Sequence, residues 1–203
     1  MTPARRERRA ALAALRRHLG AIGALRVALA VDRRLTHAHP FRRLPPPADA
    51  IEARRRARVA PAIALFDVLR LRYGDARAIA LCVEAVEAAV AVFLDTALGP
   101  LDRARLAAMS DAERAAFVHR VERGLPGVVV HVERADHEAL RFTVAACALV
   151  KLCAEAGCPE LAPVFCAGDA RFFARLDPAA RLDRATTIAG GGPCCPFRVT
   201  FGG

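Results

Sequence analysis

Residues 128–145, which read VVVHVERADHEALRFTVA, decide the fold class of this chain. Two short runs rich in β-branched residues, Val128 to Glu133 and Leu140 to Ala145, flank the polar pair Asp136-His137. This arrangement is typical of a β-hairpin. Because the preceding half of the sequence has helical periodicity, we expect the chain to change from helices to a sheet at this point.

After the hairpin, the hydrophobic period becomes helical again and then extended. We expect helices at Cys147 to Ala156 and from Pro159 onward, then strands at Leu182 to Ala189 and Phe197 to Phe201 around a glycine-rich turn. The order is therefore ββααββ. It predicts an α+β fold in which helices cover one face of an antiparallel sheet of about four strands.

The N-terminal half predicts a helical layer packed on this sheet. Residues 3–36 predict one or two arginine-rich helices, broken near Gly20 and Gly23, and the three consecutive prolines at 45–47 predict a linker or surface loop. Three further helices are expected at residues 49–73, 75–98 and 110–123.

The proline-rich stretch also sets the expected domain boundary. We assign residues 1–48 to an arginine-rich helical N-terminus and linker, and residues 49–203 to a single α+β domain. Within that domain the helices are expected at 49–124 and the sheet region at 125–203.

Composition argues against several classes of function. The formal net charge is +10, but Lys151 is the only lysine among 31 basic residues and aromatic residues make up 5%. This pattern indicates biased base composition rather than a nucleic-acid footprint. The apolar stretch Ala76 to Leu98 contains Glu84 and Glu87, so we expect a buried helix and no membrane partner. Seven cysteines without a disulfide spacing favour a cytoplasmic location.

Cysteine is the densest chemical signature, and six of the seven lie in one region: Cys147, Cys153, Cys158, Cys166, Cys194 and Cys195. Thiolates are strong nucleophiles and soft metal ligands. Cys147 is expected at a strand-to-helix junction, where backbone N–H groups favour the thiolate. We expect Cys82, Cys153 and Cys158 to be small hydrophobic residues of the core.

The C-terminal half contains several short motifs whose order and spacing can be compared with those of known families. In chain order, they are Phe142-Thr143-Val144 with Cys147, Glu155 and Gly157 before Pro159-Glu160-Leu161, Cys166 and Asp169, Leu182 with Arg184, Thr186-Thr187-Ile188, Gly191, and Cys195 with Phe197-Arg198. In this order and spacing, residues 110 to 201 resemble the L-2-amino-thiazoline-4-carboxylic acid hydrolase family. One departure is Pro196, which stands where such proteins usually carry Asp. If that Asp assists the chemistry, this chain is altered or inactive.

The resemblance implies a hydrolase of amino-acid metabolism. Such an enzyme adds water to the amidine carbon of a thiazoline and breaks the C–S bond, giving N-carbamoyl cysteine, or acts on a related small cyclic substrate. The expected catalytic residues are Cys147, Cys195, Asp169 and His131. The expected substrate-binding residues are Cys166, Arg184, Thr187 and Arg198. A cysteine or water is the nucleophile, Asp169 or His131 the base, and Arg184 or Arg198 the cation for the substrate carboxylate.

A second interpretation is a non-catalytic small-molecule-sensing domain with a cysteine-lined pocket. The glycine turn followed by Cys-x-Phe also resembles the four-vinyl-reductase-like sensory domain. That resemblance implies zinc ligands at positions where this chain has Arg184 and Thr187, which argues against the metal site. We expect no cofactor, because no spacing requires one; a structural or catalytic zinc held by Cys147, Cys166 and Cys195 is the alternative. A third interpretation is an interaction protein whose arginine-rich helices bind an acidic partner. Homo-oligomerisation is left open.

Overall fold

The hairpin expected from residues 128–145 is present. In the computed structural model, which describes residues 2–99, 101–125, 127–176 and 180–201, strand β1 (Val128–Ala135) pairs antiparallel with β2 (Ala139–Cys147). The turn is held by the Asp136 carboxylate, which accepts hydrogen bonds from the N–H groups of Glu138 and Ala139.

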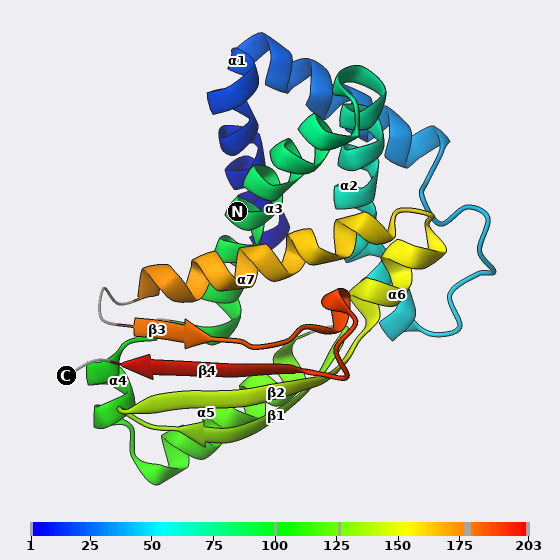
Figure 1. The fold of residues 1–203 in the computed structure, drawn as a ribbon. Helices are drawn as coiled ribbons and strands as arrows, with labels where there is room; N and C mark the ends of the chain where they lie inside the picture. Colours follow the sequence, from blue (N-terminus) through cyan, green and yellow to red (C-terminus); the bar gives the residue numbers. More distant parts are fainter. Residues whose placement is uncertain (1, 100, 126, 177–179, 202–203) are drawn as a thin grey trace.

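Two further strands complete the sheet. Strand β4 (Cys195–Phe201) pairs antiparallel with β2, and β3 (Ala180–Asp183) pairs antiparallel with β4. The strand order is β1-β2-β4-β3. Between β2 and β3 the chain forms α6 (Ala148–Glu155), the short 3-10 helix η1 (Pro159–Leu161) and α7 (Ala162–Leu176). The predicted ββααββ order and α+β class are therefore confirmed, and α7 lies along the sheet (Figure 1).

The N-terminal half is helical, as predicted. Its helices are α1 (Pro3–His37), α2 (Ala50–Tyr73), α3 (Asp75–Leu98), α4 (Arg103–Ala108) and α5 (Asp111–Gly124). Helix α1 bends at the predicted point, because Gly20 has a φ of 69° that interrupts the helical backbone. A capping box of Ser110 and Glu113 begins α5. The sequence did not predict α4. No helix of the described residues is long and apolar enough to cross a membrane.

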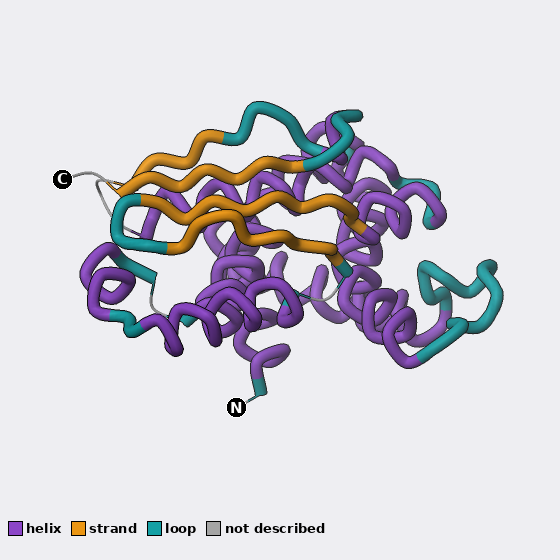
Figure 2. Tube along the Cα trace, turned by 90° about the horizontal axis from the view of Figure 1, so that it is seen from below, coloured by secondary structure: helices purple, strands orange, loops and turns teal. Residues whose placement is uncertain are grey.

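Buried and exposed residues alternate along the strands, so the sheet has a buried inner face and an exposed outer face. In β4, Cys195, Phe197 and Val199 are buried, whereas Arg198 and Thr200 are exposed. The buried side chains face α3, α5 and α7 in one hydrophobic cluster. Among the described residues, no helix covers the opposite, outer face of the sheet (Figure 2).

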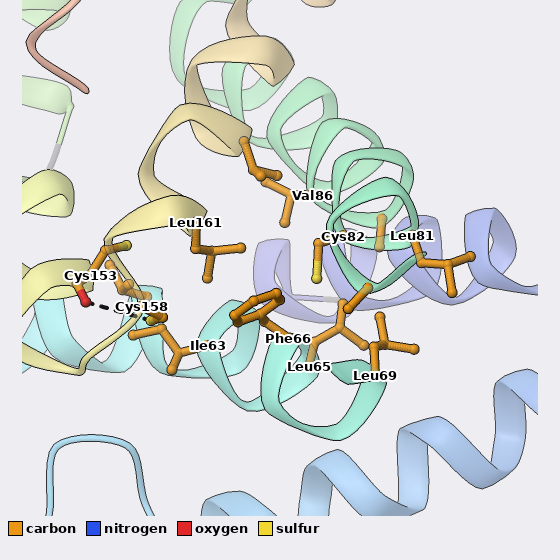
Figure 3. Packing of buried hydrophobic residues seen from close by; sticks show 14 of the residues in the cluster. Ile63, Leu65, Phe66, Leu69, Leu81, Cys82, Val86, Cys153, Cys158 and Leu161 are labelled. Carbon is orange, nitrogen blue, oxygen red and sulfur yellow. Dashed lines mark hydrogen bonds between the residues drawn. The ribbon is translucent and has the colours of Figure 1, made fainter. Parts of the chain in front are cut away.

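A second hydrophobic cluster fills the helical layer, where α1, α2, α3, α6 and α7 meet (Figure 3). Cys82, Cys153 and Cys158 belong to this cluster, and the Cys158 thiol lies 3.5 Å from the carbonyl oxygen of Cys153, to which it donates a hydrogen bond. Burial raises the pKa of Cys82 to about 12. The prediction that these three cysteines are core residues is confirmed.

Candidate functional site

An acidic and a basic side chain meet where α7 packs on β3. Asp169 lies on α7, one turn beyond Cys166, and Arg184 follows the end of β3. The Arg184 Nη2 donates to the carbonyl oxygen of Cys166 at 2.9 Å, and its Nη1 lies 3.9 Å from Asp169 Oδ2. The Arg184 guanidinium also lies over the Phe197 ring, 5.0 Å from its centroid. These contacts fix Arg184 between α7 and the sheet.

Three cysteines surround this pair. Cys147 ends β2 and Cys195 begins β4, next to it in the sheet, where Cys195 pairs with Val144. Cys147 packs against the hydrophobic cluster that contains Cys195, and Cys166 lies one turn before Asp169 on α7. Burial, and to a smaller extent the negative charge of Asp169, raises the pKa of both Cys147 and Cys166. The structure thus brings together five of the eight residues expected at the site: Cys147, Cys166, Cys195, Asp169 and Arg184.

The thiolate expected at Cys147 is not favoured. The N–H groups of Leu149 and Val150, at the beginning of α6, do lower its pKa, as the helix position predicts. Burial has the larger effect, however, and raises the pKa of Cys147 above its ordinary value. Burial likewise raises the pKa of Cys166 to about 12. Both thiols are therefore neutral at physiological pH.

The Asp169 carboxyl is the group of the site whose charge changes near neutral pH. Its side chain is only 33% exposed and lines the wall of a cavity. This partial burial raises the pKa of Asp169 to about 7, although the Arg184 guanidinium lowers it. A carboxyl with such a pKa can both accept and donate a proton at neutral pH.

The glycine-rich turn positions Cys195. The backbone N–H of Ile188 donates to the Cys195 sulfur at 3.2 Å, and Ile188 begins the short 3-10 helix η2 (Ile188–Gly190). The Thr187 hydroxyl accepts the N–H of Gly190 at 3.0 Å. Thr187, expected to bind substrate, therefore has its hydroxyl engaged in shaping this turn.

His131 and Arg198 lie elsewhere. Both are exposed on the outer face of the sheet, where His131 is the cross-strand partner of Thr143, and Arg198 that of Arg141 and Asp183. Because Asp169 and the buried Cys195 lie on the inner face, neither the expected base His131 nor the expected clamp Arg198 fits the site. Of the two expected bases and the two expected cations, Asp169 and Arg184 are the ones that lie at the site.

A cavity of about 620 Å³ adjoins Asp169 and extends between the helical layer and the sheet. Asp169, Phe142 and Phe197 line it on the side of the sheet and α7, and Arg58 of α2 is among its lining residues on the helical side. The three site cysteines are not among the lining residues, so Asp169 connects the cavity to the thiols. From the sequence, Phe197 was noted only as part of a motif. Because Phe197 is two residues from Cys195, both side chains lie on the same face of the strand. No sequence signal identified Arg58.

No group of three or more His, Cys, Asp or Glu side chains within the described ranges is arranged to hold a metal ion. The cysteines of the site come from three different elements, and Asp169 pairs with an arginine rather than with a second acid. This geometry suits acid–base chemistry on an organic molecule.

Comparison with known proteins identifies the family. The model of the L-2-amino-thiazoline-4-carboxylic acid hydrolase family matches residues 52–199, which include every group of the site. The chain belongs to this family, as its motifs predicted, and membership implies a hydrolase that acts on a small molecule. No curated protein and no solved structure matches the chain significantly.

Proposed function

We propose that this protein opens the ring of an aminothiazoline by hydrolysis, with Asp169 as its acid–base group. The observation that carries the proposal is the position of Asp169, between the cavity and the thiols, with a pKa raised to about 7. Family membership supports the thiazoline ring as the group that is cleaved.

The reaction uses one carboxyl twice. Asp169, ionised, removes a proton from water while the water oxygen adds to the amidine carbon. The protonated Asp169 then gives this proton to the ring sulfur as the C–S bond breaks. The C–S cleavage leaves an isourea, whose O–H proton shifts to nitrogen to give the N-carbamoyl thiol, and Asp169 is ionised again. Atoms balance, because substrate and one water give one product.

Water, rather than a cysteine, is the proposed nucleophile. Burial keeps Cys147 and Cys166 neutral, and a neutral thiol is a weak nucleophile. The cysteines instead supply a weakly polar surrounding that raises the pKa of the carboxyl.

Arg184 is the proposed cation for the substrate carboxylate. Its Nη1 is buried without a hydrogen-bond partner among the described residues, and it lies at 3.9 Å from Asp169, beyond hydrogen-bond distance. Arg184 does not itself line the cavity, so a substrate carboxylate that reaches past Asp169 would supply the missing acceptor.

The test is release of free thiol from L-2-amino-thiazoline-4-carboxylate. We expect wild-type protein to release thiol, and Asp169→Asn to lower kcat/KM by roughly 10²- to 10⁴-fold, the usual contribution of a positioned acid–base group. Asp183→Asn, an exposed aspartate on β3, is the matched control and should retain the wild-type rate. Equal activity of Asp169→Asn and wild type would refute the role of Asp169. Absence of thiol release from wild type would refute the reaction.

A further inference from the structure

The cavity beside Asp169 is larger and more apolar than a small polar ring requires. Its volume of about 620 Å³ falls within the roughly 300–1,000 Å³ of sites that hold drug-sized ligands. Leu, Val, Ala and Phe side chains form most of its wall, among them Leu12, Leu65, Val90, Phe142 and Phe173. A bare aminothiazoline carboxylate would leave most of this apolar wall uncovered.

The charged lining residues other than Asp169 neutralise one another. Arg8 pairs with Asp32 at 2.5 Å, and Arg58 pairs with Glu7 at 3.5 Å. The Arg8 and Asp32 side chains are 64% and 44% exposed, so the cavity reaches the surface between the two arms of α1. Deeper in the cavity wall is Asp169, whose contact with Arg184 is only a long ion pair.

We infer that the ligand of this cavity is an amphiphile, with an amidine end at Asp169 and an apolar substituent that fills the space lined by α1, α2 and α3. That this ligand is also the substrate rests on the proposed function. The substrate class is then an aminothiazoline that carries an apolar substituent on its ring or exocyclic nitrogen. A cationic amidine matches the Asp169 carboxylate, and the apolar wall matches the substituent.

S-alkylisothiouronium salts test this inference, because they present an amidinium carbon bonded to sulfur and carry an alkyl chain of any chosen length. Binding of the methyl, butyl and octyl compounds is measured by calorimetry on the full chain. We expect the Kd to fall by about fourfold for each added methylene, which corresponds to about 0.8 kcal/mol per buried CH₂.

Two alanines of α3 offer a matched pair of variants. Ala89 lines the cavity, whereas Ala80 is exposed on the same helix. Ala89→Phe should fill the space and abolish the gain in affinity with alkyl-chain length. Ala80→Phe should retain that gain in affinity. Asp169→Asn should weaken the binding of all three compounds by a similar factor. Thermal melts establish that each variant is folded.

The outcomes separate this inference from the proposed function. A Kd in wild type that does not change with chain length overturns the inference, and so does an equal gain in Ala89→Phe and wild type. A Kd that falls with alkyl-chain length, without thiol release from any aminothiazoline, supports the amphiphile site and refutes the hydrolase. Thiol release without chain-dependent binding supports the hydrolase and refutes the amphiphile.

Discussion

Asp169 is the residue at which burial and charge oppose each other most directly. Burial between α7, β4 and the cavity favours its neutral form, and Arg184 favours its charged form. The balance leaves the pKa of Asp169 at about 7, compared with an ordinary value of 3.8. Because this raised pKa exists only in the folded state, it must also make the free energy of unfolding depend on pH.

Stability should therefore fall with pH because of Asp169. The folded state binds the Asp169 proton more tightly than the unfolded state, so this contribution is complete below about pH 4 and is lost as the pH rises through about 7. At 1.36 kcal/mol per pKa unit, with a discount for partial exposure, wild type should lose about 2 kcal/mol relative to Asp169→Asn between pH 5 and pH 8.

Denaturant unfolding of the two proteins at both pH values measures this difference. Asp183→Asn again serves as the control, and its stability should follow that of wild type. A constant difference between wild type and Asp169→Asn at the two pH values would show that the Asp169 carboxyl titrates in its ordinary range.

Replacement of Cys195 distinguishes water from a thiol as the nucleophile. In Cys195→Ser the hydroxyl oxygen can still accept the Ile188 N–H. We expect ring opening to fall by no more than about tenfold, which is roughly 1.4 kcal/mol of transition-state stabilisation. Cys194→Ser controls for the loss of a thiol. Complete loss of thiol release in a folded Cys195→Ser protein would instead indicate covalent catalysis.

At the scale of elements, strand alternation determines which motif residues can reach the site. Cys195 and Phe197 face inward from β4, so Pro196 between them belongs to the outer face, where it pairs with Thr143. The position at which the family resemblance implies an Asp thus lies on the side of the sheet away from Asp169. Pro196 therefore cannot contact a substrate bound at Asp169, and its presence in place of Asp does not affect the proposed chemistry.

Pro196→Asp should accordingly change little. A substitution on the outer face shifts free energies by about 0.5 kcal/mol or less, so we expect kcat/KM for ring opening to stay within roughly twofold of wild type. The same assay of thiol release measures it. A tenfold or greater gain in kcat/KM would show that the aspartate of relatives acts on the reaction after all.

Local pattern predicted the elements better than their ends. The hairpin, the helices other than α4 and the kink at Gly20 followed from periodicity and glycine. The strand expected at Leu182 to Ala189 was placed wrongly, because β3 spans Ala180–Asp183, residues 184–187 form a loop and η2 begins at Ile188. The Thr187 hydroxyl caps η2 by accepting the Gly190 N–H, and Gly191 adopts a φ of 88° at its end. This cap and the positive φ of the glycine favour a turn over the extended conformation that Thr and Ile prefer.

At the scale of the whole molecule, the site depends on contacts between distant segments. Cys147, Cys166 and Cys195 lie on β2, α7 and β4, and the packing of α7 on the sheet brings these elements together near Asp169. The effect of burial on their pKa values could not be predicted, because it depends on how α7 packs on the sheet. The cavity was likewise not predictable, because its wall combines side chains of both hydrophobic clusters.

The pH dependence of ring opening is the sharpest test of Asp169 as the base. If ionised Asp169 activates water, kcat/KM for thiol release must rise with pH and level off above the pKa of about 7. The residual rate of Asp169→Asn should lack this transition. A wild-type rate that is already level at pH 5, or a transition near pH 7 that persists in Asp169→Asn, would contradict the account.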